Sequence, residues 1–180
     1  MQSRLRTLFT SRCTLEPLVA AHAPEMFRVL SDPAIYELEN EPPPSEAWLT
    51  RRYEVLEQRR SADGNEKWLN WVIRLPGGEL AGYVQATVLP SGASHVAYEL
   101  NSRYWRQGIG SSALAAMLEE LRCEHGVHTF VAVLKSANFR SLALLHGLGF
   151  ALATQRIVAE FAAAADELVM VNTQPAQRAP

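Results

Sequence analysis

Two glycines, Gly108 and Gly110, stand where an extended segment changes into an amphipathic helix, within YELNSRYWRQGIGSSALAAML (98–118). The first N–H groups of a helix have no partner inside the helix and carry partial positive charge, so they bind anions without needing a lysine. Glycine lets the main chain approach such an anion closely. The stretch is expected to wrap a pyrophosphate through Arg106, Gln107, Gly108, Ile109, Gly110 and Ser111, with a charge-assisted bond from Arg106.

The same two glycines also suit a tight strand-to-helix turn that binds nothing, and the motif alone leaves this alternative open. A Rossmann dinucleotide loop needs a third glycine, and the residues after Gly110 (SSALAAML) contain none. A P-loop needs Gly-Lys followed by Ser or Thr, which is also missing. The loop therefore matches neither of these two nucleotide-binding motifs.

The elements around this loop can be read from hydrophobic periodicity. Alternation predicts strands at 12–18, 68–75, 79–89, 95–100 and 128–134, and a closing hairpin within 154–171. Helical spacing predicts helices at 23–32, after an N-cap at Ser45, from 111 to near Gly126, and from Asn138 to Gly147. Consecutive strands from 68 to 100 favour an antiparallel meander. The unit from 95 to 134, strand then helix then apolar strand, favours a parallel crossover.

The chain has 180 residues with 48% hydrophobic and 20% charged residues, which fits one domain, expected over 1–172, and a disordered tail over 173–180. A net charge of -2 with interspersed signs offers no basic face for nucleic acid. No apolar run is long enough for a signal peptide core or a bilayer span, so a cytoplasmic protein without membrane contact is expected. The two cysteines, Cys13 and Cys123, predict buried reduced thiols, and no metal site is expected.

The combination of SRYWRQGIGSSALAAML, the strand HTFVAVL and NFRSLALLHGLGF resembles the acetyl-CoA-binding half of the GNAT superfamily of N-acetyltransferases. The Tyr-Trp pair before the glycines and the opening SRCTLEPLVAAHAPEMFRVLSDPAIYELE resemble its Rim-type branch, which includes ribosomal-protein N-terminal acetyltransferases. The resemblance implies an α/β (mixed α+β) fold with a twisted mixed sheet of about seven strands and flanking helices. It also implies a splay between the fourth and fifth strands, 95–100 and 128–134, where the pantetheine arm of acetyl-CoA would pair with the backbone near Leu100 and Asn101.

Acetylation of an amine requires a base, a stabilised carbonyl oxygen and a protonated or solvated leaving thiolate. Glu99 is the first candidate for the base, because it interrupts an apolar strand beside the expected gap and partial burial would raise its pKa toward neutrality. A purely structural carboxylate is the alternative. His95 lies on the same strand face and is the second candidate.

For the leaving group, the superfamily often places a tyrosine seven residues after the asparagine that opens the following helix. Counting from Asn138 reaches Leu145, so that tyrosine is absent. Ser141 is the remaining hydroxyl, and Rim-type enzymes resembling this chain use a serine there as a hydrogen-bond donor. Asn138 itself is expected both to cap the helix and to bond the pantetheine. Trp105, which replaces the usual Gln or Arg of the loop, is expected mainly to anchor the strand end.

The acceptor side is expected to come from the first two helices, the loop IYELENEPPPSE and the closing hairpin. The acidic side chains Glu37, Glu39 and Glu41 are a weak prediction for attracting a cationic amine, since acidic loops are usually only solvated. The aromatic residues Trp68, Trp71 and Tyr83 either line this pocket or fill the core, and the core is favoured.

Three classes of function remain open, and one of them is another nucleotide binder, which ATP or NAD would stabilise more than acetyl-CoA. The other two concern acetyl-CoA. One is transfer of an acetyl group from acetyl-CoA to a primary amine, either a protein N-terminus or a small molecule, in a ternary complex without a metal or a covalent intermediate. The other is a catalytically idle CoA-binding or regulatory module, suggested by the absent tyrosine and by Trp105. A homodimer is a further possibility that the resemblance raises.

Overall fold

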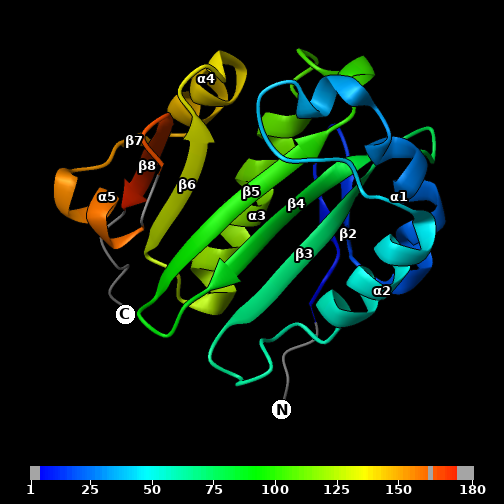
Figure 1. Cartoon of the computed structure of the whole chain (residues 1–180). Coiled ribbons are helices and arrows are strands. Elements are labelled where there is room, and N and C mark those ends of the chain that lie inside the picture. Colours follow the sequence, from blue (N-terminus) through cyan, green and yellow to red (C-terminus); the bar gives the residue numbers. More distant parts are fainter. Residues whose placement is uncertain (1–4, 162–163, 174–180) are drawn as a thin grey trace.

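An eight-stranded mixed sheet forms the centre of the chain, in the order β1-β2-β3-β4-β5-β6-β8-β7 (Figure 1). The computed structural model describes residues 5–161 and 164–173. The strands are β1 (Leu8–Phe9), β2 (Thr14–Pro17), β3 (Lys67–Arg74), β4 (Leu80–Val88), β5 (Ala93–Leu100), β6 (Thr129–Lys135), β7 (Ala151–Leu152) and β8 (Glu167–Thr173). The helices are α1 (Ala23–Leu30), α2 (Glu46–Glu57), α3 (Ile109–His125), α4 (Phe139–Gly147) and α5 (Gln155–Glu160), with short 3-10 turns at Ala20–His22, Pro33–Tyr36 and Ser102–Tyr104.

The strands β2 to β5 form the antiparallel meander that the sequence predicts, and β6 then lies parallel to β5. This parallel pairing covers only three positions, from Ala93 opposite Thr129 to His95 opposite Val131. Beyond them β5 stays paired with β4 as far as Leu100, while β6 stays paired with β8 as far as Lys135. Figure 1 shows the two strands diverging toward α4. The predicted splay is therefore confirmed.

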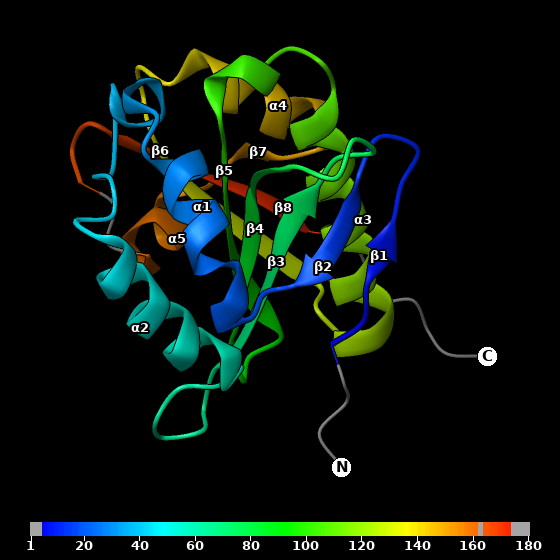
Figure 2. The ribbon, with the colours of Figure 1, turned by 90° about the vertical axis from the view of Figure 1, so that its right-hand side faces the viewer.

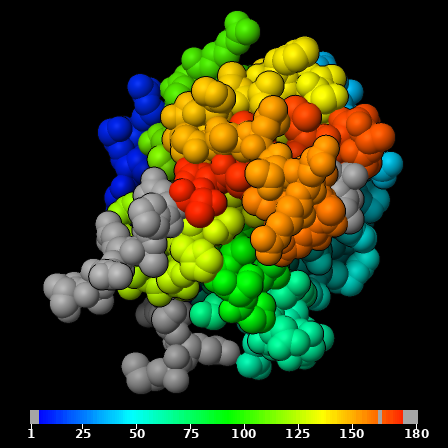
Figure 3. Space-filling model, turned by 90° about the vertical axis from the view of Figure 1, so that its left-hand side faces the viewer, coloured from blue at the N-terminus to red at the C-terminus, as the bar shows by residue number. Residues whose placement is uncertain are grey.

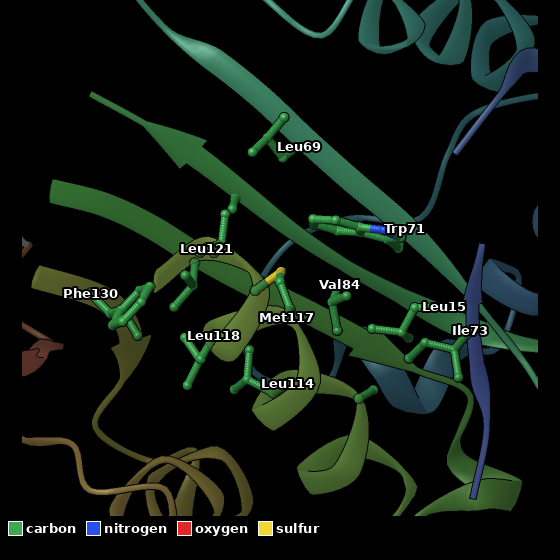
Figure 4. Packing of buried hydrophobic residues seen from close by; sticks show 14 of the residues in the cluster. Leu15, Leu69, Trp71, Ile73, Val84, Leu114, Met117, Leu118, Leu121 and Phe130 are labelled. Atoms are coloured by element: carbon green, nitrogen blue, oxygen red, sulfur yellow. The ribbon is translucent and has the colours of Figure 1, made fainter. Parts of the chain in front are cut away.

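The two faces of the sheet are covered by different helices (Figure 2), with α1 and α2 on one side and α3 on the other. The larger core lies under α3, where side chains of β2, β3 and β4 meet a helical stripe (Figure 4). The stripe consists of Leu114, Met117, Leu118 and Leu121, all at most 3% exposed. These are the positions that helical spacing selects in the sequence. A smaller core joins α1 and α2 to β3 and β4.

Alternation along β3 divides its side chains between these two layers. Trp71 packs in the larger core and donates its indole N–H to the carbonyl oxygen of Arg6 at 2.9 Å. Val72 packs in the smaller core, and Asn70 lies on the same strand face as Val72. One strand therefore serves a packed core on one face and a more polar layer on the other.

Two features differ from the sequence-based expectations. A short additional strand, β1, pairs with β2, so the sheet has eight strands rather than about seven. The segment expected as a closing hairpin does bring β7 and β8 together antiparallel, but α5 is inserted between them. The helix has the sequence QRIVAE, in which Gln155, Arg156, Ala159 and Glu160 are good helix formers. Figure 3 shows these C-terminal segments, orange and red, gathered on one side of the molecule.

The chain ends are described only in part. Thr173, expected in the tail, is the last residue of β8. The rest of that predicted tail, 174–180, lies outside the described residues, and the boundary of the domain stays a prediction. Within 5–161 and 164–173, no helix has the length and apolar character needed to cross a membrane.

The start of α2 provides a test of the local folding signal. Ser45 has extended backbone angles and its hydroxyl accepts a hydrogen bond from the N–H of Trp48 at 3.1 Å, as the sequence predicts for an N-cap. Ser45→Ala is expected to lower the free energy of unfolding by about 1 kcal/mol, measured by urea denaturation. Ser45→Asp, which retains a capping oxygen, should keep the wild-type value. Equal losses in both variants would contradict the capping role.

Candidate functional site

A cavity of about 450 Å³ lies at the end of β5, beyond the positions where β5 pairs with β6. Its walls come from the end of β5, the loop 104–108, the first turn of α3 and the first two turns of α4. The predicted site residues that line it are Glu99, Leu100, Arg106, Gly108, Ile109, Gly110, Ser111, Asn138 and Ser141. Residues separated by more than thirty positions in the sequence thus meet at one cleft.

The loop before α3 has the geometry of an anion-binding turn. Arg106 and Gly108 both adopt left-handed backbone angles, with φ of 59° and 74°. Left-handed residues in such a turn direct successive backbone N–H groups toward one point, where an anion can bind. No side chain caps the 17-residue helix at Gly108, and the hydrogen bond from Ser112 N–H to Gly108 is made at 3.0 Å. The N–H groups that precede Ser112 are therefore free to bind an anion.

Glycine is favoured at Gly108 by its positive φ, and both glycines lie close to neighbouring side chains. A Cβ atom on Gly110 would come 3.3 Å from the side chain of Leu144 in α4, and one on Gly108 would come 3.1 Å from that of Arg12. Arg12 also donates to the carbonyl oxygen of Gln107 at 3.0 Å. This arginine brings a second cation, besides Arg106, to the loop. Sequence reasoning missed it because 95 positions separate it from its partner. The loop fits a diphosphate on these grounds.

Two of the expected cofactor residues do not line the cleft. The N–H of Asn101 donates to Ala81 and its carbonyl oxygen accepts from Tyr104. Its side chain donates to the carbonyl oxygen of Val29 and accepts from the N–H of Arg103. These bonds hold the end of β5, and the pairing of pantetheine with the backbone near Asn101 stays a prediction. Gln107 points away as well, with its amide donating to the carbonyl oxygen of Arg103.

Glu99 is partly buried on β5 and faces the α1 and α2 side of the sheet. Its carboxylate accepts a hydrogen bond from Asn40 at 3.1 Å. Burial raises the pKa of Glu99 to about 7, while hydrogen bonds from Tyr83 and Asn40 act in the opposite direction and nearby Glu39 adds to the rise. A carboxylate with this pKa accepts a proton near neutral pH, which is the property required of a general base.

A second cavity of about 490 Å³ lies on the other side of Glu99, between α2, the loop 40–44 and the β3–β4 surface. Glu99 and Asn40 line both cavities. The wall of the second cavity is largely aromatic and apolar, formed by Tyr36, Trp48, Tyr53, Tyr83, Leu18, Leu30 and the prolines 42–44. Glu99 therefore stands where a molecule in one cavity would meet a molecule in the other.

The opposite wall of the first cavity carries Ser141 and Asn138. The Asn138 side chain caps α4 by accepting from the N–H of Ser141 at 3.1 Å, and it donates to Glu39 at 2.6 Å. The capping role predicted for Asn138 is confirmed, and its contact with pantetheine stays a prediction. Tyr98 of β5, which sequence reasoning did not select, also lines this cavity, and the Ser141 hydroxyl is near enough to lower its pKa although burial raises it overall to about 12.

The segment that carries Glu37 and Glu39 contacts the start of α4. Glu37 lies 3.8 Å from the guanidinium of Arg140, whose cation stacks 3.9 Å above the ring of Trp105. With the contact between Glu39 and Asn138, these interactions connect the segment before α2 to α4. Only the third acidic residue, Glu41, lines the second cavity. The weak prediction that all three attract an amine is therefore not supported for the two that are engaged elsewhere.

The aromatic candidates divide between core and site. Trp71 is fully buried in the core, whereas Tyr83 belongs to the second cavity, where its hydroxyl bonds Glu99. Trp105 anchors the strand end as predicted, donating to the carbonyl oxygen of Leu100 at 2.8 Å. That carbonyl is thereby occupied, and the Leu100 side chain and N–H remain for the cofactor prediction. Trp68 donates to the Glu66 carboxylate, away from both cavities.

His95 and the cysteines lie outside the cleft. The His95 ring packs edge-on against Phe161 with 4.7 Å between ring centroids, and burial lowers its pKa. Cys13 is buried as expected, but Cys123 is exposed and donates to Glu119 late in α3, so the expectation of two buried thiols is wrong for Cys123. No group of three or more potential metal ligands occurs among the described residues.

The position of Glu99 depends on a close approach between β4 and β5. A Cβ atom on Gly82 would overlap the carbonyl oxygen of Glu99. This oxygen belongs to the backbone of β5, so it cannot rotate aside as the end of a side chain could. Gly82→Ala is therefore expected to displace Glu99 and to lower kcat/KM for amine acetylation by about 10-fold or more. Gly147→Ala is the control, because nothing lies within 4 Å of the added methyl group at the end of α4. Equal activity in both variants would show that this contact does not position Glu99.

The comparisons with known proteins agree with this geometry. Residues 12–151 match the family model described as acetyltransferase (GNAT) domain. No curated protein sequence matches the chain. Among solved structures, the chain is similar to RimL, a ribosomal L7/L12 alpha-N-protein acetyltransferase in complex with coenzyme A, with a TM-score of 0.79 and 18% identity over 96% of this chain and 100% of that one.

Two further structures show the same fold. One is a ribosomal-protein-S5-alanine acetyltransferase from Vibrio fischeri, with a TM-score of 0.76 and 16% identity over 94% of this chain and 100% of that one. The other is described as a putative ribosomal-protein-serine acetyltransferase from Vibrio cholerae, with a TM-score of 0.72 and 18% identity over 94% and 98%. The family match covers most of the chain and includes the phosphate-loop motif and the start of α4. The chain belongs to the GNAT acetyltransferase family and is an acetyl-CoA-dependent N-acetyltransferase.

Proposed function

We propose that Glu99 is the general base of this transferase and that the acceptor is the α-amine of a peptide or protein N-terminus. The observation that carries the proposal is the place of Glu99 on the wall shared by the two cavities. Acetyl-CoA occupies the first cavity, between the end of β5 and the starts of α3 and α4, and the acceptor enters the second cavity, between α2 and the β3–β4 surface. The amine nitrogen then meets the thioester beside the Glu99 carboxylate.

The cofactor is held by the residues that line the first cavity. The N–H groups at the start of α3 and the guanidinium group of Arg106 bind the diphosphate, and Arg12, which is bonded to the Gln107 carbonyl outside that lining, adds positive charge. The pantetheine arm runs along β5, whose edge is left unpaired after His95, and reaches Asn138 and Ser141 at the start of α4. When bound, acetyl-CoA supplies the activated acetyl group.

The reaction is a direct displacement. The neutral amine attacks the carbonyl carbon, a C–N bond forms, and the nitrogen loses a proton to the Glu99 carboxylate, directly or through one water molecule. The C–S bond breaks with its electron pair on sulfur, and the Ser141 hydroxyl donates a hydrogen bond to the resulting thiolate. Cys123 lies late in α3, away from the cleft, so acetyl transfer through a cysteine is not part of the proposal.

The choice of a peptide end rather than a free small amine rests on two supports. The second cavity is bounded by a helix and a proline-containing loop, so it accommodates the first residue of a chain while the rest extends outward. Structures of similar fold are described as acetyltransferases of ribosomal proteins. We place the reaction in the cytoplasm, where such N-termini are exposed, and a homodimer stays a prediction that sedimentation can test.

The kind of acceptor is tested by the release of free thiol from acetyl-CoA in the presence of peptides and small amines. Turnover with peptides supports the proposal, and turnover with small amines alone replaces the peptide end by a small acceptor. Tight CoA binding without turnover of any of these acceptors would contradict the proposal.

The role of Glu99 predicts a pH-dependent rate. Below a pH of about 7 the carboxyl is protonated and accepts no proton, so kcat/KM should fall on the acidic side with that apparent pKa. Glu99→Gln should lose this acidic limb and lower kcat by about 100-fold at pH 8. An unchanged profile in the variant, from initial rates between pH 5.5 and 9, would assign the base elsewhere.

The same raised pKa predicts the sign of a stability effect, which checks the environment of Glu99 independently of activity. The folded protein binds the proton more tightly than the unfolded chain, so stability is lost as pH rises from the unfolded pKa through about 7. The melting temperature of Glu99→Gln relative to wild type should therefore be higher at pH 8 than at pH 5. A constant difference across this range would argue against a raised pKa.

The role of Ser141 predicts a selective effect on turnover. Ser141→Ala removes the proposed donor to the thiolate, so kcat should fall by about 10-fold while the dissociation constant of CoA changes little. Ser136→Ala is the control, because Ser136 is an exposed residue directly after β6. If CoA affinity and kcat fell together in Ser141→Ala, the hydroxyl would be acting in cofactor binding instead.

A further inference from the structure

Two hydrogen-bond donors in the second cavity have no partner among the residues that the structure describes. They are the hydroxyl of Tyr53 on α2 and the side-chain amide nitrogen of Asn70 on β3, and both atoms are shielded from bulk solvent. The two residues are 4% and 5% exposed. A buried donor without a partner costs about 1–3 kcal/mol, so natural cores seldom contain one. Finding two on the wall of one cavity indicates that a bound molecule completes them.

The other tyrosines of this cavity show the contrast. The hydroxyl of Tyr36 donates to the carbonyl oxygen of Leu30 at 2.8 Å, and that of Tyr83 bonds the Glu99 carboxylate. Their hydroxyls are satisfied by the protein. Asn70 lies opposite Gln85 in the pairing of β3 with β4, and Gln85 also lines the cavity. The unpartnered groups thus belong to a polar floor inside an otherwise aromatic and apolar enclosure.

The register of the sheet places this floor relative to the reacting centre. Glu99 lies opposite Tyr83, and Tyr83 lies opposite Val72, so Asn70 is two strands across and two residues along from Glu99. Strand spacing and rise put their Cα atoms about 12 Å apart. An acceptor whose amine is held at Glu99 must therefore project a further group several bonds into the cavity to approach Asn70. Tyr53 reaches toward the same space from α2.

The charge of the cavity selects the kind of group. Glu41 and Glu99 both line it, against the single guanidinium of Arg52. A carboxylate entering this enclosure meets more negative than positive charge. A second ammonium would leave both donors without an acceptor. A neutral oxygen, from a hydroxyl or a carboxamide, satisfies the donors and avoids both penalties.

We infer that Tyr53 and Asn70 determine acceptor specificity, by donating hydrogen bonds to a neutral oxygen on the side chain of the acceptor's first residue. The inference rests on the proposed function and goes beyond it. The preferred N-terminal residues are those with a neutral oxygen several bonds from the amine, such as Asn and Gln. Residues of the same shape that lack the oxygen leave the two donors unpaired, and the site rejects them for that reason.

Shape-matched peptides provide the test. Peptides that differ only in their first residue are compared in the pairs Thr and Val, Asn and Leu, and Gln and homoleucine, with kcat/KM measured from thiol release. In at least one pair the oxygen-bearing peptide should react about 10-fold faster or more. The pair with the largest ratio shows how far from the amine the oxygen lies when it meets the two donors. Ratios near one in all three pairs would overturn the inference while leaving the transferase activity established.

Variants of Tyr53 and Asn70 show whether these two donors cause the ratio of kcat/KM between the paired peptides. Tyr53→Phe and Asn70→Leu should each reduce the ratio to about threefold or less, chiefly by slowing the oxygen-bearing peptide. Tyr36→Phe is the matched control, because its hydroxyl is already engaged by Leu30, and it should retain the wild-type ratio. A ratio unaffected by both donor variants, or abolished equally by the control, contradicts the inference.

Two further measurements, the melting temperature of Tyr53→Phe and peptide binding, test the inference without relying on turnover. Removal of an unsatisfied buried hydroxyl leaves the folded state no weaker, so the melting temperature of Tyr53→Phe should equal or exceed that of wild type. A large drop would show that the hydroxyl serves the fold. If no peptide is acetylated, the proposed function fails, and the same peptides are then titrated calorimetrically into CoA-saturated protein. Tighter binding of the oxygen-bearing member still supports the reading by Tyr53 and Asn70, and equal dissociation constants overturn it.

Discussion

The limited pairing of β5 with β6 is the constraint on which the rest of the site depends. Parallel neighbours normally pair along their full common length, but here three positions are joined and the strands then separate. Each strand keeps its other partner, β4 or β8, so neither loses its place in the sheet. The separation leaves backbone groups of β5 without a strand partner, and it creates the space into which the helix ends of α3 and α4 open.

Much of this arrangement can be predicted from local patterns, because the responsible signals are short-range. The change from period two to period 3.6 after Gly110 marks the strand-to-helix turn, and Leu114, Met117 and Leu121 are buried as that period requires. Ser45 and Asn138 cap their helices as their residue types favour. The splay between β5 and β6 has no such local signal, because the residue types of these two strands do not indicate where their pairing ends. It was predicted only through the family resemblance.

The features that sequence reasoning missed all depend on contacts between distant segments. Arg12 reaches the phosphate loop across 95 positions, and Asn40 reaches Glu99 across 59. Tyr83 has the pattern of a core residue, and only the three-dimensional layer it faces makes it part of the site. The polar groups of Asn101 are likewise engaged by Ala81 and Val29, which come from other elements and which its own sequence context does not indicate. Residue type and spacing identify candidates, and tertiary packing decides which groups remain free.

Strand alternation explains how one small sheet carries both stability and chemistry. On β3, Leu69, Trp71 and Ile73 enter the core under α3, while Asn70 faces the α2 side. The well-packed face compensates for the unfavourable groups that the other face holds, namely a carboxyl whose ionisation is disfavoured and two donors without partners. These groups share the property that their energy improves when a ligand with the right polar atoms enters. The face that carries Glu99, Tyr53 and Asn70 is therefore less stable alone than with substrates bound. This difference in free energy favours substrates whose polar atoms match these groups.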